Sequence, residues 1–394
     1  MAIFSVEYKE IENNKFFKRK IIKIFGIKIN KKVKTAPVLC LVDAGGIGDY
    51  VFCRPYFKYI KQSPKYKNYN IIYVGKIFYD DFVRAYDDEV FDAIIEYNEE
   101  YYYRNKKYLK QLLKKINKYK IDDLINLRTI TIGQNNDFLV RHNIVNGIEA
   151  KNKFVSAVDL HPDRYNKKGQ LKIYDNILLT TPKDFCFETI FRRNMFQDLL
   201  KIDIPVETDK LEKLFDFKKN HILISLMAND AWKKLSNKQW KGIIDHIIDN
   251  ISEDTELLFL GIAREKERIQ KVLDELKDPT KCINLAGKIS SAFLPTLLAN
   301  SQFLLAVETG TVHLAHSVGC KAICLSNGSW YGKFLPYDDD LIKYIYPQNF
   351  KKLIDSNSNS ISDFYGPNQT FSVEEIDVND VIEAVDELME IERV

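Results

Sequence analysis

Residues 38–53 read VLCLVDAGGIGDYVFC, and this stretch decides the class of fold. The first five residues, 38–42, are all apolar, which is typical of a strand buried on both faces of a sheet. A glycine-rich turn follows, and the apolar segment after it is expected to form a helix. A strand that leads through a glycine turn into a helix opens a βαβ unit, whose next strand runs parallel.

The same alternation of short apolar runs and helical segments continues along the chain. In the first half, strands are expected at 38–42, 71–74, 93–96 and 124–127, and helices at 54–62 and 101–120. In the second half, strands are expected at 222–226, 257–260, 303–307 and 322–325, and helices at 240–251, 265–276 and 292–300. The pattern predicts an α/β fold of two Rossmann-like, doubly wound parallel-sheet domains. A deep cleft between them is expected at the carboxyl ends of both sheets.

Three parts of the chain are predicted from this pattern. Residues 1–36 form a basic amphipathic arm, residues 37–205 the first domain and residues 206–394 the second domain. The second domain ends in an amphipathic closing helix at 377–394, with Asp377 or Asn379 near its N-cap.

The composition excludes several classes of protein. The chain has 394 residues, 45% of them hydrophobic, and a formal net charge of +3. This length is too great for one compact core, and the charge excludes a globally basic nucleic-acid binder. No run of about 18 uncharged apolar residues occurs, so no transmembrane helix is expected. Six scattered cysteines without a Cys-x-x-Cys pair indicate reduced thiols, as in a cytoplasmic protein.

The positive charge is concentrated near the N-terminus. Residues 15–34 contain nine basic residues and no acidic one, which leaves 49 basic and 55 acidic residues, a net charge of −6, in the rest of the chain. Apolar residues at 17, 21, 24 and 25 follow helical spacing and predict an amphipathic helix. Such a helix fits the surface of an anionic membrane, and it equally fits a solvated helix on one edge of the first domain.

The first candidate site is the turn after strand 38–42. Gly46 and Gly48 let the backbone approach a ligand, and Asp49 follows at the start of the helix. The dinucleotide fingerprint fails, because its third glycine would stand at position 51, which is valine, and no Gly-Lys-Ser/Thr follows. A carboxylate here suits a general base that takes a proton from a substrate hydroxyl, and a plain helix N-cap is the alternative.

Two further turns follow strands of the second domain. Residues 228–240, ANDAWKKLSNKQW, carry Lys233, which suits neutralisation of a diphosphate; packing and solvation are the alternative. Residues 307–316, VETGTVHLAH, form a Thr-Gly-Thr turn before a small-residue helix, where N–H groups and hydroxyls make a phosphate cradle. His313 and His316 lie one turn apart, but no third metal ligand has fitting spacing. We expect His313 to donate toward phosphate or the turn, and His316 to be structural.

In this order and spacing the elements resemble glycosyltransferase family 9, the ADP-heptose:lipopolysaccharide heptosyltransferase-like enzymes, over about residues 37–335. The resemblance rests on Gly48-Asp49 before Arg54-Pro55, Lys233 before the Trp240 helix, Gly261 after a strand, Asn284-Leu285-Ala286-Gly287, and Glu308-Thr309-Gly310-Thr311-Val312-His313-Leu314-Ala315. Two positions depart from the family pattern: Glu308 stands for Asp, and Leu235-Ser236 stands for Trp-Pro. Both departures favour a different sugar or acceptor within the same chemistry.

The resemblance implies a GT-B enzyme with an acceptor-binding first domain and a nucleotide-sugar-binding second domain. It implies an inverting transfer that needs no metal or other cofactor, with ADP-heptose favoured as co-substrate and a lipid-linked or lipopolysaccharide-type glycan as acceptor. Asp49 is the expected catalytic base. The expected donor-binding residues are Asn229, Lys233, Gly261, Gly287, Glu308, Thr309, Gly310, Thr311 and His313. The expected acceptor-binding residues are Gly46, Gly48, Arg54 and Arg128, and for Arg54, Arg128 and Arg141 a surface salt bridge is the alternative role.

Other functions stay open at this point. A GT-B transferase that uses a UDP- or GDP-sugar is one, and Glu308 makes it plausible. A catalytically silent GT-B module that binds glycan or scaffolds a complex is another, whereas the failed glycine fingerprint disfavours a nicotinamide oxidoreductase. The expected location is the cytoplasm, with the basic arm favouring the inner face of a bacterial inner membrane, and no nucleic-acid partner is expected.

Overall fold

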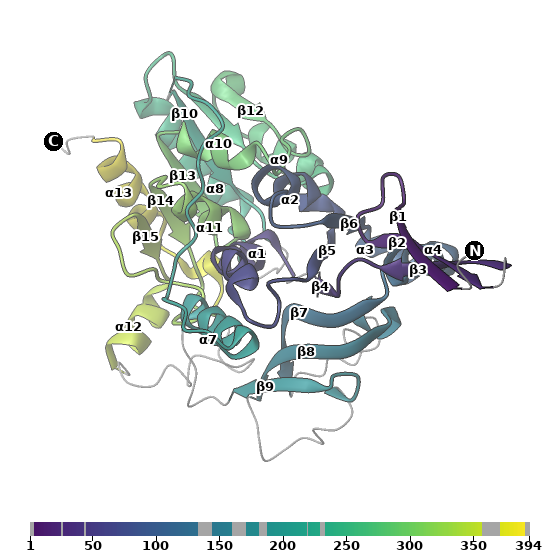
Figure 1. Ribbon diagram of the computed structural model, residues 1–394. Helices are drawn as coiled ribbons and strands as arrows, with labels where there is room; N and C mark the ends of the chain where they lie inside the picture. The colour runs from purple at the N-terminus through teal and green to yellow at the C-terminus, as the bar shows by residue number, and fades with distance from the viewer. Residues whose placement is uncertain are drawn as a thin grey trace.

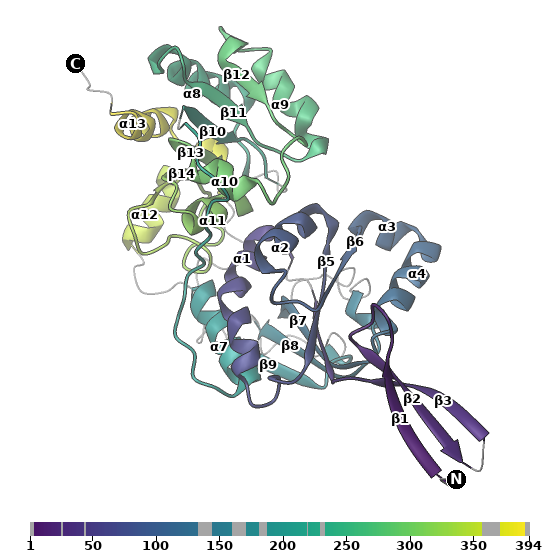
Figure 2. The same cartoon turned by 45° about the horizontal axis from the view of Figure 1, so that its top comes forward.

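The computed structural model describes residues 4–24, 27–42, 45–132, 144–159, 171–180, 187–218, 220–228, 233–356 and 371–390. Two α/β halves pack against each other, and a small antiparallel sheet projects from the first half (Figures 1 and 2).

The first half is built on a six-stranded parallel sheet in the order β6-β5-β4-β7-β8-β9. Its strands are β4 (Val38–Val42), β5 (Asn70–Lys76), β6 (Ala93–Tyr97), β7 (Ile121–Ile132), β8 (Ala150–Asp159) and β9 (Asn176–Thr180). Its helices are α1 (Ile47–Cys53), η1 (Arg54–Gln62), η2 (Ile77–Tyr79), α2 (Asp80–Asp87), α3 (Glu99–Arg104), α4 (Lys106–Asn117), η3 (Ile144–Gly147) and α7 (Glu188–Leu200). Every residue of β4 is buried, because the strand lies in the middle of the sheet with packed side chains on both faces.

The second half repeats this design with the order β12-β11-β10-β13-β14-β15. Its strands are β10 (His221–Ser225), β11 (Glu256–Phe259), β12 (Cys282–Asn284), β13 (Phe303–Val307), β14 (Ala322–Leu325) and β15 (Ile342–Ile345). Its helices are α8 (Asn237–Asn250), η6 (Ala263–Glu265), α9 (Lys266–Leu273), η7 (Pro279–Lys281), α10 (Leu294–Ala299), α11 (Gly310–Ser317), α12 (Gln348–Ser356), η9 (Val373–Glu375) and α13 (Val378–Leu388). The prediction of two doubly wound parallel sheets is confirmed. The expected strands coincide with observed ones to within one residue or lie inside them.

The helix expected within residues 15–34 is wrong. The structure has β2 (Phe17–Ile24) paired antiparallel with both β1 (Phe4–Glu10) and β3 (Ile27–Lys34). The β-branched residues explain the difference: alternation of isoleucine with polar residues, as at 27–30, has the period of a strand and outweighs the partial helical spacing. Phe25 and Gly26 lie outside the described residues.

The segment that joins the two halves contacts both of them. The Tyr56 hydroxyl of the first half donates to the Glu207 carbonyl at 3.1 Å, and the Leu211 N–H donates to the Ser317 carbonyl of α11 at 2.9 Å. The boundary expected at 205/206 falls within this segment and stays a prediction.

The closing helix is α13, which begins after Asp377. Asp377 Oδ1 accepts the Asn379 N–H at 2.9 Å, so Asp377 is the N-cap. The helix packs on α8, where His246 Nε2 and Asp386 Oδ1 are 2.6 Å apart. Within the described ranges, no helix is long and apolar enough to cross a bilayer.

Candidate active site

The two halves meet where helices α1 and α11 begin. A Cβ on Gly310 would lie 3.1 Å from the Gly48 nitrogen, and a Cβ on Gly48 would lie 2.8 Å from His313 Cδ2. Glycine at both positions lets the two helix starts approach this closely. Each helix follows a central strand of its sheet, β4 or β13. The predicted turns at 45–49 and 308–313 therefore come together at the carboxyl ends of the two sheets, where α/β folds bind ligands.

Asp49 lies in the first turn of α1. Its Oδ2 accepts a hydrogen bond from the Gly46 N–H at 2.8 Å, so the carboxylate also serves as a helix cap. Burial raises the pKa of the Asp49 carboxyl above its ordinary value, and the Arg192 charge, the Gly46 N–H and the Lys333 charge each lower it in part. A desolvated carboxylate that neighbouring cations favour in its ionised form has the character of a general base.

A buried ion pair on α7 supplies the charge next to Asp49. Arg192 Nε lies 2.6 Å from Glu188 Oε1, and the side chains are 2% and 1% exposed. Arg192 also donates to the Leu127 carbonyl, at the place where the register between β7 and β8 shifts. The bulge in β7 thus helps to hold the buried guanidinium.

A loop of the second half completes this charge cluster. Lys333 Nζ lies 4.0 Å from Glu188 Oε2, and the Lys333 carbonyl accepts the Glu188 N–H at 2.7 Å. Glu188, Arg192 and Lys333 are not among the residues predicted from sequence, because a Glu–Arg pair four residues apart is usually a solvated pair on a helix surface. A signal was available: Glu188 and Arg192 share the i+4 stripe of Phe196 and Leu200, and both of these are fully buried.

Lys233 and Glu308, both predicted for the donor site, are paired with each other. Lys233 Nζ lies 2.6 Å from Glu308 Oε1, and their side chains are 9% and 7% exposed. Ser326 Oγ donates to the second carboxylate oxygen, Oε2, at 2.5 Å. Both oxygens of Glu308 are therefore engaged within the protein.

Thr309 precedes α11 and leaves the helix start without a side-chain cap. It is the N-cap residue, with extended backbone, and its hydroxyl makes no capping hydrogen bond. The Oγ1 atom is buried and has no hydrogen-bond partner among the described residues. A buried hydroxyl without a partner is unfavourable, and Gly310 and Thr311 place the positive end of the helix dipole beside it. This helix start can therefore receive an anionic ligand.

His313 is buried at the contact between the halves. Its Nδ1 lies 2.9 Å from the Tyr337 hydroxyl, and its ring packs edge-on against Phe52 of α1 with 4.9 Å between centroids. Burial lowers the pKa of His313 to about 3, so its ring is neutral. The expected donation toward phosphate stays a prediction. His316 stacks on Tyr337 with 3.6 Å between centroids, a structural contact.

Gly261 and Gly287 lie side by side at the ends of β11 and β12. The Gly287 N–H donates to the Gly261 carbonyl at 2.9 Å. Gly287 has a φ of +73°, and a Cβ there would lie 2.8 Å from Ala263 Cα. A side chain at 287 is excluded by both conformation and space, while the donor-binding roles of the two glycines stay predictions.

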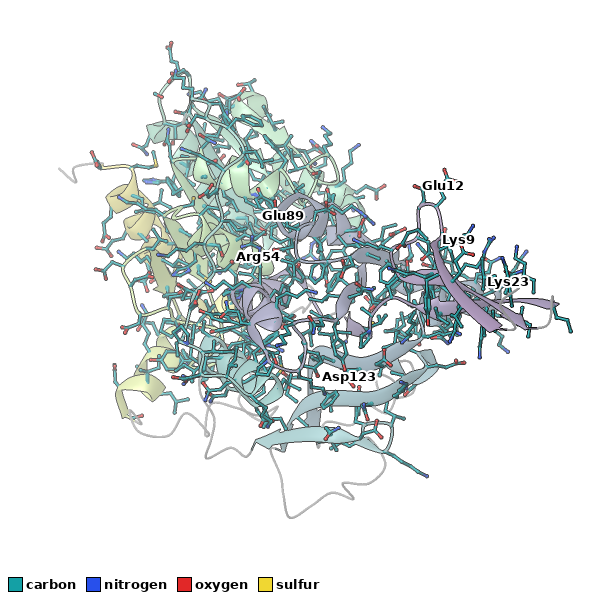
Figure 3. The ribbon with its side chains drawn as sticks, viewed as in Figure 1. Lys9, Glu12, Lys23, Arg54, Glu89 and Asp123 are labelled. Atoms are coloured by element: carbon teal, nitrogen blue, oxygen red, sulfur yellow. The ribbon has the colours of Figure 1, made fainter. Side chains whose placement is uncertain are left out.

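Arg54 is enclosed by ion pairs at the centre of the molecule (Figure 3). Its Nη1 donates to Asp209 Oδ1 at 2.7 Å, its Nε donates to Asp87 Oδ2 at 3.1 Å, and its Nη2 donates to the Tyr86 carbonyl at 3.2 Å. The acceptor contact predicted for Arg54 is untested, and these partners would compete with it. Through Asp209, Arg54 holds the connecting segment against the first half.

The remaining predicted residues are placed only in part. Arg128 is half-buried on β7, directly after Leu127, and its N–H donates to Asn126 Oδ1 at 3.1 Å. Asn229 and Arg141 lie outside the described residues. Within the described residues, no group of three or more His, Cys, Asp or Glu side chains is placed to hold a metal ion.

The profile of glycosyltransferase family 9 (heptosyltransferase) matches residues 162–355. No curated protein sequence matches the chain.

Solved structures share the fold. The glycosyl transferase family 9 protein from Veillonella parvula is 15% identical with a TM-score of 0.60, and covers 90% of this chain and 97% of its own. The E. coli ADP-heptose LPS heptosyltransferase II is 12% identical with a TM-score of 0.60 over 89% and 98% of the two chains. The E. coli heptosyltransferase WaaC with ADP is 12% identical with a TM-score of 0.57 over 89% and 99%.

These structural matches establish the GT-B-like architecture of two six-stranded parallel sheets. The profile match supplies the family: the chain contains a glycosyltransferase family 9 (heptosyltransferase) domain, matched over residues 162–355.

Proposed function

We propose that the enzyme moves a heptose-type sugar from a nucleoside diphosphate sugar, with ADP-heptose favoured, to a hydroxyl of a lipid-linked or lipopolysaccharide-type glycan. The observation that carries the proposal is the meeting of two helix starts. One bears Asp49, a carboxylate with a raised pKa, and the other bears the unpartnered Thr309 hydroxyl. A base on one side and an anion-binding turn on the other suit attack by a hydroxyl on a sugar that leaves a diphosphate.

The proposed step is an inverting displacement. Asp49 takes the proton of the acceptor hydroxyl, the hydroxyl oxygen forms a bond to the anomeric carbon, and the bond from that carbon to the diphosphate oxygen breaks with its electron pair on the diphosphate. The Gly46 N–H holds Oδ2 of Asp49, so we assign the proton transfer to Oδ1. The N–H groups at 309–311 and the Lys233 charge stabilise the leaving diphosphate. No metal is invoked for this step.

The bound forms of the structural relatives support the nucleotide part of this proposal. WaaC has been solved with ADP and with ADP-2-deoxy-2-fluoro heptose. We propose a nucleotide sugar as the partner of this protein too, with adenine as the favoured base and heptose as the favoured sugar.

The test separates binding from chemistry. In Asp49→Asn, transfer should fall by at least about a hundredfold, because a general base contributes 10²–10⁴-fold. Calorimetric titration with ADP should show unchanged affinity, since the nucleotide lies on the other half. Asp49→Ala should give the same result. Normal turnover by either variant would refute the base assignment.

The surroundings of Glu308 support one alternative class of donor. Both of its carboxylate oxygens are hydrogen-bonded, to Lys233 and Ser326, so contacts between Glu308 and a heptose would have to replace these bonds. A UDP- or GDP-sugar is therefore the alternative donor. Thermal-shift measurements with ADP, UDP and GDP decide between them, since a ligand at about 100 times its Kd stabilises by about 2.7 kcal/mol.

A further inference from the structure

The antiparallel sheet β1–β2–β3 has one apolar face. The register sets Val6, Ile22 and Ile29 directly opposite one another, so their side chains share a face, and Ile27 and Tyr8 lie on the same face one step away. Val6 is 39%, Tyr8 58%, Ile27 66% and Ile29 47% exposed. We call these five residues the apolar face of the arm.

The other face of the same sheet is basic. Lys9, Arg19 and Lys32 lie opposite one another in one row, and Lys23 and Lys28 in another. Like charges directly across a sheet repel each other, which costs stability. Lys23 lies out on the projecting sheet, as Figure 3 shows. Within the sheet, Lys9 Nζ lies 3.3 Å from Glu7 Oε1 and Lys32 Nζ lies 4.2 Å from the centroid of the Phe17 ring.

The body of the protein does not cover the outer part of this sheet. Both ribbon views show β1, β2 and β3 extending away from the helices of the first half (Figures 1 and 2). The contacts that tie the arm down lie at its base, where Lys34 Nζ and Asp122 Oδ2 are 2.5 Å apart. Exposed isoleucines on a protruding element mark an interaction surface.

We infer that the arm docks on an anionic lipid bilayer through its apolar face. Ile27 and Ile29 enter the interface between headgroups and acyl chains, and Lys20 and Lys31 of the same face reach lipid phosphates along the flexible stems of their side chains. The lysines of the basic face add a longer-range attraction to the anionic surface. The charges on the apolar face favour an anionic bilayer over a second copy of the protein. Lys20 and Lys31 lie opposite each other on the apolar face, beside the isoleucines. A second copy stacked on this face would bring like charges together, whereas anionic lipid neutralises them.

This inference deepens the proposed function and rests on it for its purpose, because a lipid-linked acceptor is presented at a membrane surface. The element proposed to contact the membrane is a β-sheet and not the basic amphipathic helix expected from the sequence. The membrane contact is the face of a β-sheet, and its key residues alternate along β3 at 27 and 29.

Flotation of the full-length chain with lipid vesicles tests the inference without donor or acceptor. One vesicle type is phosphatidylcholine alone, and the other is an equal mixture of phosphatidylcholine and phosphatidylglycerol. The double variant Ile27→Ser/Ile29→Ser keeps every charge, and Lys23→Gln/Lys28→Gln keeps every apolar residue. Ile77→Ser is the matched control, because Ile77 is an isoleucine 52% exposed on the body of the first half.

The wild type and Ile77→Ser should float with the mixed vesicles and not with phosphatidylcholine. The isoleucine double variant should bind about tenfold more weakly, and the lysine double variant should lose on the order of tenfold or more. Unchanged flotation of the isoleucine variant would overturn the inference, as would equal binding to both vesicle types. Self-association of the wild type that is lost in the isoleucine variant, seen by sedimentation without vesicles, would assign the face to a second copy instead. None of these outcomes depends on sugar transfer, so failure here leaves the proposed reaction standing.

Discussion

The buried pair between Lys233 and Glu308 allows a stability prediction that does not depend on substrate. The two groups lie 2.6 Å apart with side chains 9% and 7% exposed, and they come from turns 75 residues apart in the chain. Replacing Lys233 with methionine keeps the packed stem and removes the charge. Glu308 is then left with the hydroxyl of Ser326 as its remaining described partner.

The expected cost of Lys233→Met is about 3–5 kcal/mol, because removing one partner leaves an uncompensated buried charge. In Lys233→Met/Glu308→Gln that charge is gone, and stability should return to within about 1–2 kcal/mol of the wild type. With a slope of about 2–3 kcal/mol/M in urea, the single variant should unfold about 1–2 M earlier.

Urea unfolding followed by tryptophan fluorescence measures this directly, since all three tryptophans belong to the second half, at 232, 240 and 330. Lys234→Met is the matched control and should change stability by less than about 0.5 kcal/mol. If the double variant were destabilised by the sum of its two single variants, the pair would not be coupled and the reasoning would be refuted.

Three further predictions follow from the site. The Lys333 charge lowers the pKa of Asp49, so the variant Lys333→Met should raise that pKa further. The acid limb of the pH–rate profile should then move to higher pH. An unmoved limb would contradict the electrostatic link between the two residues. In Gly48→Ala, the new Cβ would lie 2.8 Å from His313 Cδ2 and should force the starts of α1 and α11 apart. Sugar transfer should fall at least about tenfold, while the circular dichroism spectrum stays unchanged. Full activity would show that the close contact is dispensable. Burial raises the pKa of Asp209 to about 6, so the folded state binds a proton more tightly than the unfolded state. The stability that Asp209 contributes is therefore present at low pH and is lost as the pH rises through about 6. Relative to Asp209→Asn, the wild type should gain about 2–3 kcal/mol between pH 7 and pH 4, and a constant difference in unfolding free energy would argue against this titration.

Local sequence was sufficient for the central strands of both sheets and for the glycine turns that follow them. Runs such as 38–42 and 303–307 are uniformly apolar because a central parallel strand is buried on both faces, so their composition reports their environment directly. Glycines after these strands, at 46, 48 and 310, identified the turns that face each other. The strands β8, β9, β12 and β15 escaped prediction. Polar residues interrupt the apolar pattern of β8 and β15, and β12 has three residues.

Tertiary contacts determine which charged groups pair with each other and which secondary structure the N-terminal arm adopts. Lys233 was predicted to hold a diphosphate, but only the fold shows that it meets Glu308, because a pairing between distant turns leaves no periodic signal in sequence. The cluster around Asp49 likewise combines α7 with Lys333 from a loop of the other half. In residues 15–34 the local pattern allowed both a helix and strands, and pairing of β2 with β1 and β3 selected strands, because backbone hydrogen bonds between strands are gained only when the neighbours are in place. Composition and periodicity therefore indicate which segments are buried and where the glycine turns lie, whereas long-range packing sets which charged groups meet and which faces stay exposed.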